Sequence, residues 1–324
     1  MSQAAATVPT LLLRKLRACM SPAAAIAPAV IVLLCMTPSG VRAQQTFQEP
    51  EAAATALIDA ARTGDQQALG RVLGAAGSDI VRSGDEVADA AARKSFVEAY
   101  DAKHRLSMDG DSKAVLVIGQ NDFPVPIPIV RRDGLWRFDA VAGRNEIVFR
   151  RIGRNELDAI QACLAYVDAQ NEYADKDRGA GPGAYAQRVV SSTGKKDGLY
   201  WPTSAGEDPS PLGDLVAGAT SQGYRVGERK PFHGYYFKIL TKQGASAPGG
   251  ELDYVVGGKM IGGFALVAYP AEYRNSGVMS FIVNHAGVVF QKDLGPGTAG
   301  IAERMTAFDP DKTWQKVSDT EPLR

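Results

Sequence analysis

The fold of this 324-residue chain is decided by NELDAIQACLAYVDAQNEYADKD (155–177), GYYFKIL (234–240) and GGFALVAYPAEYRNSGVMSFIVNHAGVVFQKDLG (262–295). In the first segment, apolar residues recur at the 3-4-3 spacing of one helix face, namely Leu157, Ile160, Leu164 and Val167. We therefore predict an amphipathic helix with Asn155 as its N-cap. Cys163 lies on the same face and is expected to be a small buried hydrophobe.

The later segments predict an antiparallel sheet. Strand-like runs cover residues 235–240, 263–269, 278–284 and 288–292, and a tight turn at 284–287 separates the last two. One face of this sheet needs an apolar partner, which the helix stripe can supply. The region 179–227 is rich in Gly, Pro, Ser and Asp and predicts a long loop.

The first half of the chain predicts helices followed by strands. Helical patterns cover residues 49–62, 65–73 and 85–103, and strand patterns cover 113–119, 125–131 and 135–139. The dipeptide Asp133-Gly134 predicts a hairpin. Prolines 124, 126 and 128 predict a protected edge strand. The fold class is therefore α+β, with two domains at 46–150 and 151–324.

The element order of the first domain resembles the cone-shaped folds of the ketosteroid isomerase and cystatin type, which imply a pocket. Its candidate polar lining residues are His104, Asp122, Trp136 and Asp139. The alternative is that Trp136 belongs to the core and His104 is an exposed strand residue.

The second half resembles the globular head of type IV pilins and type II secretion pseudopilins. Matching helix positions are Glu156, Ala159, Ile160, Leu164, Ala169, Gln170 and Tyr173. Matching sheet positions are Gly234, Tyr235, Phe237, Phe264, Ala268, Pro270, Gly277, Phe281, Val283, Gly287 and Val288. No apolar anchor helix with a prepilin-peptidase site precedes this part, so we do not expect assembly into a filament.

The whole chain after residue 43 also resembles a family of exported bacterial proteins catalogued as a domain of unknown function. The segments that carry this resemblance are SGDEVAD (83–89), FPVPIPIV (123–130), WRFDAVAG (136–143), RRIGRNE (150–156) and FDPDKTW (308–314). That family implies no catalytic assignment.

Residues 1–43 have the pattern of a secretory signal peptide. Basic residues precede an apolar run at 23–36, and Val41-Arg42-Ala43 places small residues at the cleavage site. We predict cleavage after Ala43 and a periplasmic or secreted product without a membrane span. Cleavage leaves 32 basic and 36 acidic side chains, a net charge of −4. Nucleic acid is therefore an unfavourable partner.

The residues that could carry chemistry do not converge in the sequence. The histidines His104, His233 and His285 lack a second ligand at metal-binding spacing, so we predict neither a metal site nor a cofactor. His233 is expected to bond a strand carbonyl. Ser83-Gly84-Asp85 with Asp89 indicates a helix start. A charged group at the domain junction is expected to fix the two domains, and its members are Glu146, Arg150, Arg151, Arg154 and Glu156.

The sequence leaves three functions open. The first is an exported binding or interaction module that uses the 179–227 face or the sheet edge, with an envelope protein or small ligand as its partner. The second is an enzyme with a general acid or base in the cone-like pocket. The third is an accessory of a pilus or secretion machine, which rests on fold analogy. Enzymatic activity is the less favoured prediction.

Overall fold

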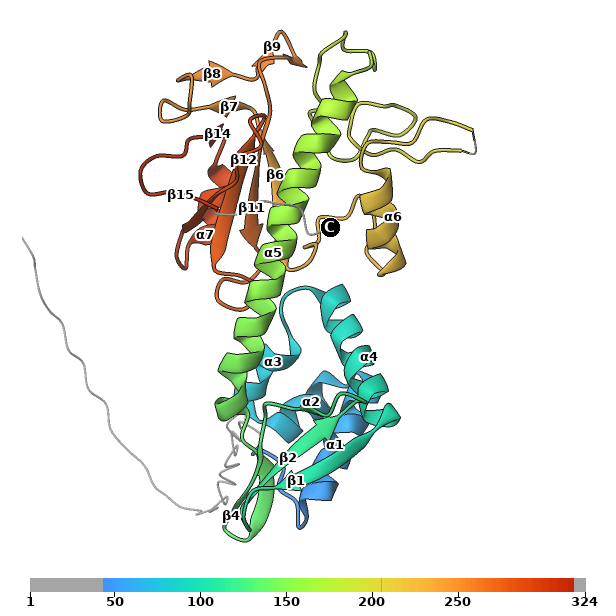
Figure 1. Cartoon of the computed structure of the whole chain (residues 1–324), viewed down its shortest axis with the longest axis vertical. Helices are drawn as coiled ribbons and strands as arrows, with labels where there is room; N and C mark the ends of the chain where they lie inside the picture. Colours follow the sequence, from blue (N-terminus) through green and yellow to red (C-terminus); the bar gives the residue numbers. More distant parts are fainter. Residues whose placement is uncertain (1–42, 205, 318–324) are drawn as a thin grey trace, which may run out of the picture. The chain divides into compact units, whose positions relative to one another are not determined.

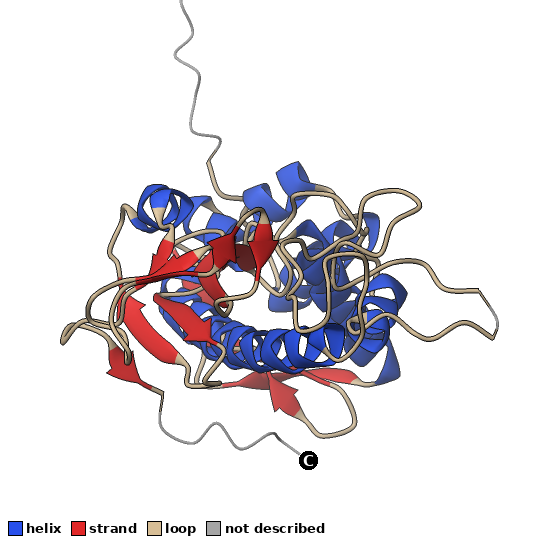
Figure 2. Ribbon diagram, turned by 90° about the horizontal axis from the view of Figure 1, so that it is seen from above, coloured by secondary structure: helices blue, strands red, loops and turns tan. Residues whose placement is uncertain are grey.

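The computed structural model describes residues 43–204 and 206–317, so the predicted signal peptide lies outside the described residues apart from Ala43. The helices are α1 (Pro50–Thr63), α2 (Gln66–Leu73), α3 (Ser78–Val81), α4 (Glu86–Ala102), α5 (Ala140–Ala174), α6 (Gly213–Ser221) and α7 (Thr298–Arg304) (Figure 1). A 3₁₀ turn at Ala75–Gly77 connects α2 to α3. The predicted α+β class is confirmed, because these helices accompany several antiparallel sheets (Figure 2).

The first sheet follows α4. It contains β1 (His104–Met108), β2 (Lys113–Ile118), β3 (Phe123–Pro124), β4 (Ile129–Arg132) and β5 (Leu135–Phe138). Its order is β1-β2-β4-β5, and β3 also pairs with β2.

Two predictions about this sheet have different outcomes. The hairpin is confirmed, because Asp133 and Gly134 adopt φ of 55° and 81° between β4 and β5. The protected edge strand is wrong. Pro126 and Pro128 lie in a break between β3 and β4, and β4 pairs on both sides. A proline ring fixes φ and removes an N–H donor, so the run is divided into β4, which pairs on both sides, and the two-residue β3 with Pro124, which pairs with β2 on one side.

The second sheet contains β6 (Tyr235–Leu240), β11 (Ala265–Pro270), β12 (Met279–Asn284), β13 (Phe290–Asp293) and β15 (Gln315–Lys316). Its order is β15-β13-β12-β11-β6 with antiparallel neighbours throughout. Between β6 and β11 lie β7 (Lys242–Gln243), β8 (Leu252–Asp253), β9 (Val255–Val256) and β10 (Lys259–Met260). The strand β14 (Ala307–Phe308) pairs with β7 in parallel.

Helix α5 begins sixteen residues earlier than predicted. Its N-cap is Asp139, whose carboxylate accepts a hydrogen bond from the Ala142 N–H at 3.2 Å, so the predicted Asn155 cap is wrong. No proline or turn pair interrupts residues 140–154, and the helix continues through them. Asn155 is buried and donates to the Ser276 carbonyl at 2.9 Å. Leu157 is 56% exposed and does not belong to the core-facing stripe.

Two clusters of buried apolar side chains lie along the chain. One runs from Phe47 to Ala140, where α1 and α2 meet the first sheet. The other runs from Ala159 to Val317, where the later turns of α5 meet the second sheet, and Cys163 is fully buried there as predicted. Helix α5 passes through the predicted domain boundary at 150/151, and the boundary itself stays a prediction. Among the described residues, no helix has the length and apolarity that crossing a membrane requires.

Candidate functional site

The four residues predicted to line a pocket do not form one site. Trp136 is 4% exposed and belongs to the first core, which confirms its alternative assignment. His104 is an exposed residue of β1, also as in the alternative. Its ring stacks on Tyr100 with centroids 3.8 Å apart, and its Nδ1 lies 2.9 Å from the Tyr100 carbonyl oxygen.

Both carboxylates of that group have structural partners. Asp122 accepts from the Lys103 Nζ at 2.9 Å on the surface. Asp139 caps α5 and accepts from Arg132 at 3.2 Å. These contacts hold a loop and a helix end, so they give no support to an acid/base pair with His104.

The charged junction residues have separate roles. Arg150 pairs with Glu146 within α5, at 2.6 Å. Arg151 donates to the carbonyls of Asp79 and Ile80 and to the Asn275 side chain, at 2.7, 2.5 and 2.7 Å. Burial lowers the pKa of Arg151.

Of the two remaining residues of this charged group, Glu156 also bonds a distant segment of the chain from α5. The Glu156 carboxylate accepts from the N–H groups of Val278 and Met279 at 2.9 and 3.0 Å. Arg154 is exposed. The predicted junction therefore acts mainly through backbone groups of distant segments, and only Glu146 and Arg150 pair with each other.

A buried carboxylate, Asp85, connects segments from both halves of the chain. It is 1% exposed and is the N-cap of α4, as its predicted helix start requires. Its Oδ1 accepts from the N–H groups of Val87 and Ala88. Its Oδ2 accepts from the Tyr224 hydroxyl and the Gly234 N–H, both at 2.9 Å. Four hydrogen bonds thus compensate the cost of burying this side chain.

His233 lies beside this carboxylate and makes side-chain bonds, so the predicted bond to a strand carbonyl is wrong. Its Nδ1 lies 2.6 Å from the Asp158 carboxylate, and its Nε2 lies 3.1 Å from the Gln222 side-chain oxygen. The backbone N–H of His233 donates to the Tyr224 hydroxyl. The imidazole also stacks on the Tyr224 ring. His233 has φ of 49°, a left-handed backbone conformation that Gly234 continues at 77°.

Burial and the Asp85 carboxylate keep the Tyr224 hydroxyl in its neutral form. Burial, followed by the nearby Asp85 carboxylate, raises the pKa of Tyr224 well above its ordinary value. The hydroxyl therefore acts as a hydrogen-bond donor to Asp85. Together, Asp85, Asp158, Gln222, Tyr224 and His233 form a polar clamp that holds both ends of the segment 222–234.

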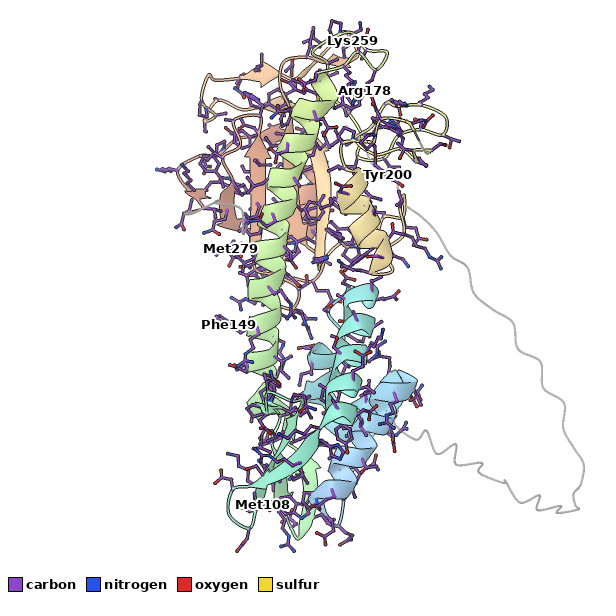
Figure 3. All side chains as sticks on the ribbon, turned by 45° about the vertical axis from the view of Figure 1, so that its right-hand side comes forward. Met108, Phe149, Arg178, Tyr200, Lys259 and Met279 are labelled. Carbon is purple, nitrogen blue, oxygen red and sulfur yellow. The ribbon has the colours of Figure 1, made fainter. Side chains whose placement is uncertain are left out.

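This clamped segment closes one side of a cavity of about 470 Å³. The other walls come from α5, α6 and the second sheet, through Ala162, Tyr166, Leu215, Val216, Ala219, Phe237 and Leu266. A further wall comes from Val189 and Val190, and Val190 bridges to Tyr200, which is labelled in Figure 3. The lining is mainly apolar side chains.

Helix α6 leaves much of its apolar surface uncovered. None of its residues is buried, although Leu215, Val216 and Ala219 line the cavity. Leu215, Val189 and Val226 have exposed fractions of 38, 36 and 42%. Apolar side chains gathered around a concave site in this way are typical of ligand-binding surfaces.

Charges at the cavity rim compensate one another. Glu228 lies 3.7 Å from Arg225 and 3.3 Å from Lys230. Lys230 also lies 3.9 Å from Glu86 of α4. A rim that pairs its charges internally favours an uncharged group in the cavity over an ion.

The family model described as "Protein of unknown function (DUF2950)" matches residues 44–317. The chain belongs to this family. The matched region includes both buried clusters, the polar clamp and the cavity, so all of them belong to the DUF2950 region of the chain. No curated protein and no solved structure matches the chain. The resemblance to pilin heads is therefore not confirmed and stays a prediction.

The sequence does not reveal the cavity of this DUF2950 protein, because the composition of residues 179–227 predicts a loop. Leu212, Leu215, Val216 and Ala219 follow helical spacing within that region and could have indicated α6. The clamp residues gave no comparable signal, because Asp85 and Tyr224 are 139 positions apart.

Proposed function

We propose that the protein is an exported binding module of the periplasm or cell envelope, which holds an apolar group of its ligand in the cavity beside α6. The observation that carries this proposal is the cavity itself. Its volume of about 470 Å³ falls within the range of about 300–1,000 Å³ that is typical of ligand sites.

The energetic support comes from the uncovered apolar wall. Complete burial of a Val or Leu side chain stabilises by about 1.5–3 kcal/mol, and residues such as Leu215 and Val226 are already partly covered. A ligand that covers several of them would gain a few kcal/mol before the cost of association.

The export part of the proposal rests on the signal-peptide pattern of residues 1–43. The family match begins at residue 44, directly after the predicted cleavage point, which is consistent with a segment that is removed.

An enzymatic role has weaker support. His233 and Asp158 resemble an acid/base pair, but the Gln222 side chain already contacts the other imidazole nitrogen. A general base needs a nitrogen within reach of the substrate proton, so Gln222 would have to move first. A role as a pilus or secretion accessory rests on the unconfirmed pilin resemblance alone.

The test uses the uncharged fluorescent probe N-phenyl-1-naphthylamine, titrated with the protein. We expect saturable fluorescence enhancement that Ala219→Trp weakens by at least about tenfold, because the indole fills the cavity. Ala217→Trp is the matched control, since Ala217 is exposed on the same helix and does not line the cavity.

Near-ultraviolet circular dichroism should show that both variants keep the native fold. Absence of saturable binding to the wild-type protein, or equal effects of the two tryptophans, would contradict the proposed function.

A further inference from the structure

Among the described residues, one edge of the second sheet lies at β6, and the other lies at the two-residue β15. Strand β6 ends the order β15-β13-β12-β11-β6, so only one of its sides pairs with another strand. At its start, the Tyr235 N–H and carbonyl both bond to Phe232, at 3.1 and 2.8 Å, and these groups therefore point away from β11. The residue opposite Tyr235 in β11 is Pro270, which has no N–H to offer.

The same direction follows for every second residue of β6. In an antiparallel strand the N–H and carbonyl of one residue point to the same side, and successive residues alternate. Phe237 and Ile239 therefore present their backbone groups at the free edge, whereas Lys238 bonds to β11. Within the described part of the chain, no hydrogen bond reaches Phe237 or Ile239 from outside the sheet.

This edge and the cavity beside α6 are adjacent. The Phe237 side chain lines the cavity, together with Leu266 of the neighbouring strand. Residues 235, 237 and 239 share one face of the sheet, because side chains alternate along a strand. A chain paired with β6 would lie about 4.8 Å from it and would direct every second side chain toward the same face.

We infer that the ligand is an extended peptide segment, which pairs with β6 as an added strand and places an apolar side chain in the cavity. This inference rests on the proposed function and specifies its ligand. An extended peptide supplies both partners that the site lacks, namely backbone groups for Phe237 and Ile239 and an apolar side chain for the α6 wall. An acyl chain fills the cavity but leaves the strand edge unpaired, so it is the less favourable ligand class.

Hydrogen bonding to β6 sets the expected arrangement of the peptide. The peptide residue opposite Phe237 has its Cβ about 4.5–5.5 Å from the Phe237 Cβ and on the cavity side. Specificity should therefore depend on this residue and on those two positions away. The intervening residues should contribute through their backbone rather than through their side chains.

The test selects linear peptides from a displayed random library against the protein, with counter-selection on Ala219→Trp. Each selected peptide is then resynthesised with single N-methyl groups along its backbone. We expect methylation at alternate positions to weaken binding by about tenfold or more, since it removes hydrogen bonds to β6. Methylation at the intervening positions serves as the matched control.

Amide hydrogen exchange gives an independent readout. Peptide binding should slow exchange at Phe237 and Ile239, while Lys238, already bonded to β11, should change little. Recovery of no peptide, equal tolerance of N-methylation at all positions, or unchanged exchange at Phe237 and Ile239 would overturn the inference. Binding of the naphthylamine probe decides the proposed function separately, so the two failures are distinguishable.

Discussion

Replacement of Asp85 should destabilise the protein far more than its role as a helix cap explains. Asp85→Ala removes the cap of α4 and also leaves two donors, the half-buried Tyr224 hydroxyl and the buried Gly234 N–H, without their acceptor. An unsatisfied buried donor costs about 1–3 kcal/mol and a half-buried donor costs less, so the two together cost about 2–4 kcal/mol. Asp65→Ala is the matched control. Asp65 caps α2 through two backbone N–H groups in the same way but is exposed.

The assay is urea unfolding followed by far-ultraviolet circular dichroism, with the free energy of unfolding extrapolated to water. We expect Asp85→Ala to lower this free energy by at least about 2 kcal/mol more than Asp65→Ala does. Asp85→Asn should have an intermediate effect, because its amide oxygen can serve only one side of the cluster. Equal losses for the two alanine variants would refute the reasoning, since the bonds to Tyr224 and Gly234 would then contribute nothing.

Three further outcomes follow from the structure. Arg151→Ala removes three hydrogen bonds and should cost about 2–4 kcal/mol in urea unfolding, whereas exposed Arg154→Ala should cost less than about 0.5 kcal/mol. Similar effects of the two substitutions would contradict the role of Arg151. The Arg144 guanidinium, which donates to Asp79, lowers the pKa of that carboxyl below its usual 3.8. The contribution of the Asp79–Arg144 pair to stability is therefore complete above about pH 4 and is lost as the pH falls through the native pKa of Asp79. Asp79→Asn should flatten the fall of the melting temperature in this acid range, and an unchanged profile would count against the pair. Burial raises the pKa of Cys163 to about 12, so the native thiol should resist iodoacetamide near neutral pH and react in urea. Rapid labelling of the native protein, followed by mass spectrometry, would disprove this burial.

Local signals predicted much of the fold correctly. Three predictions that depend only on neighbouring residues appear in the structure. They are the helix start at Asp85, the Asp133-Gly134 hairpin and the strands of the second sheet. The start of α5 is not predictable in this way, because Asn155 is a good capping residue in isolation. Its side chain instead bonds the Ser276 carbonyl 121 positions away, which no local pattern indicates.

The candidate site was less predictable for the same physical reason. His233 gave no sign in the sequence that Asp158 and Gln222 would be its partners, because they come from α5 and from the end of α6. The glycines and prolines around α6 concealed a short helix whose apolar residues remain uncovered. The free edge of β6 required the sheet order, which depends on pairings between distant segments.

The continuity of α5 has a consequence for cooperativity. A helix of 35 residues is about 52 Å long, and its first turns belong to one buried cluster while its later turns belong to the other. If one cluster melts, half of the helix loses its tertiary support while the other half stays anchored. Keeping the unsupported half helical then costs free energy, because isolated helical segments are marginally stable in water. The shared helix therefore penalises states in which only one core is formed, and we expect the two cores to unfold together.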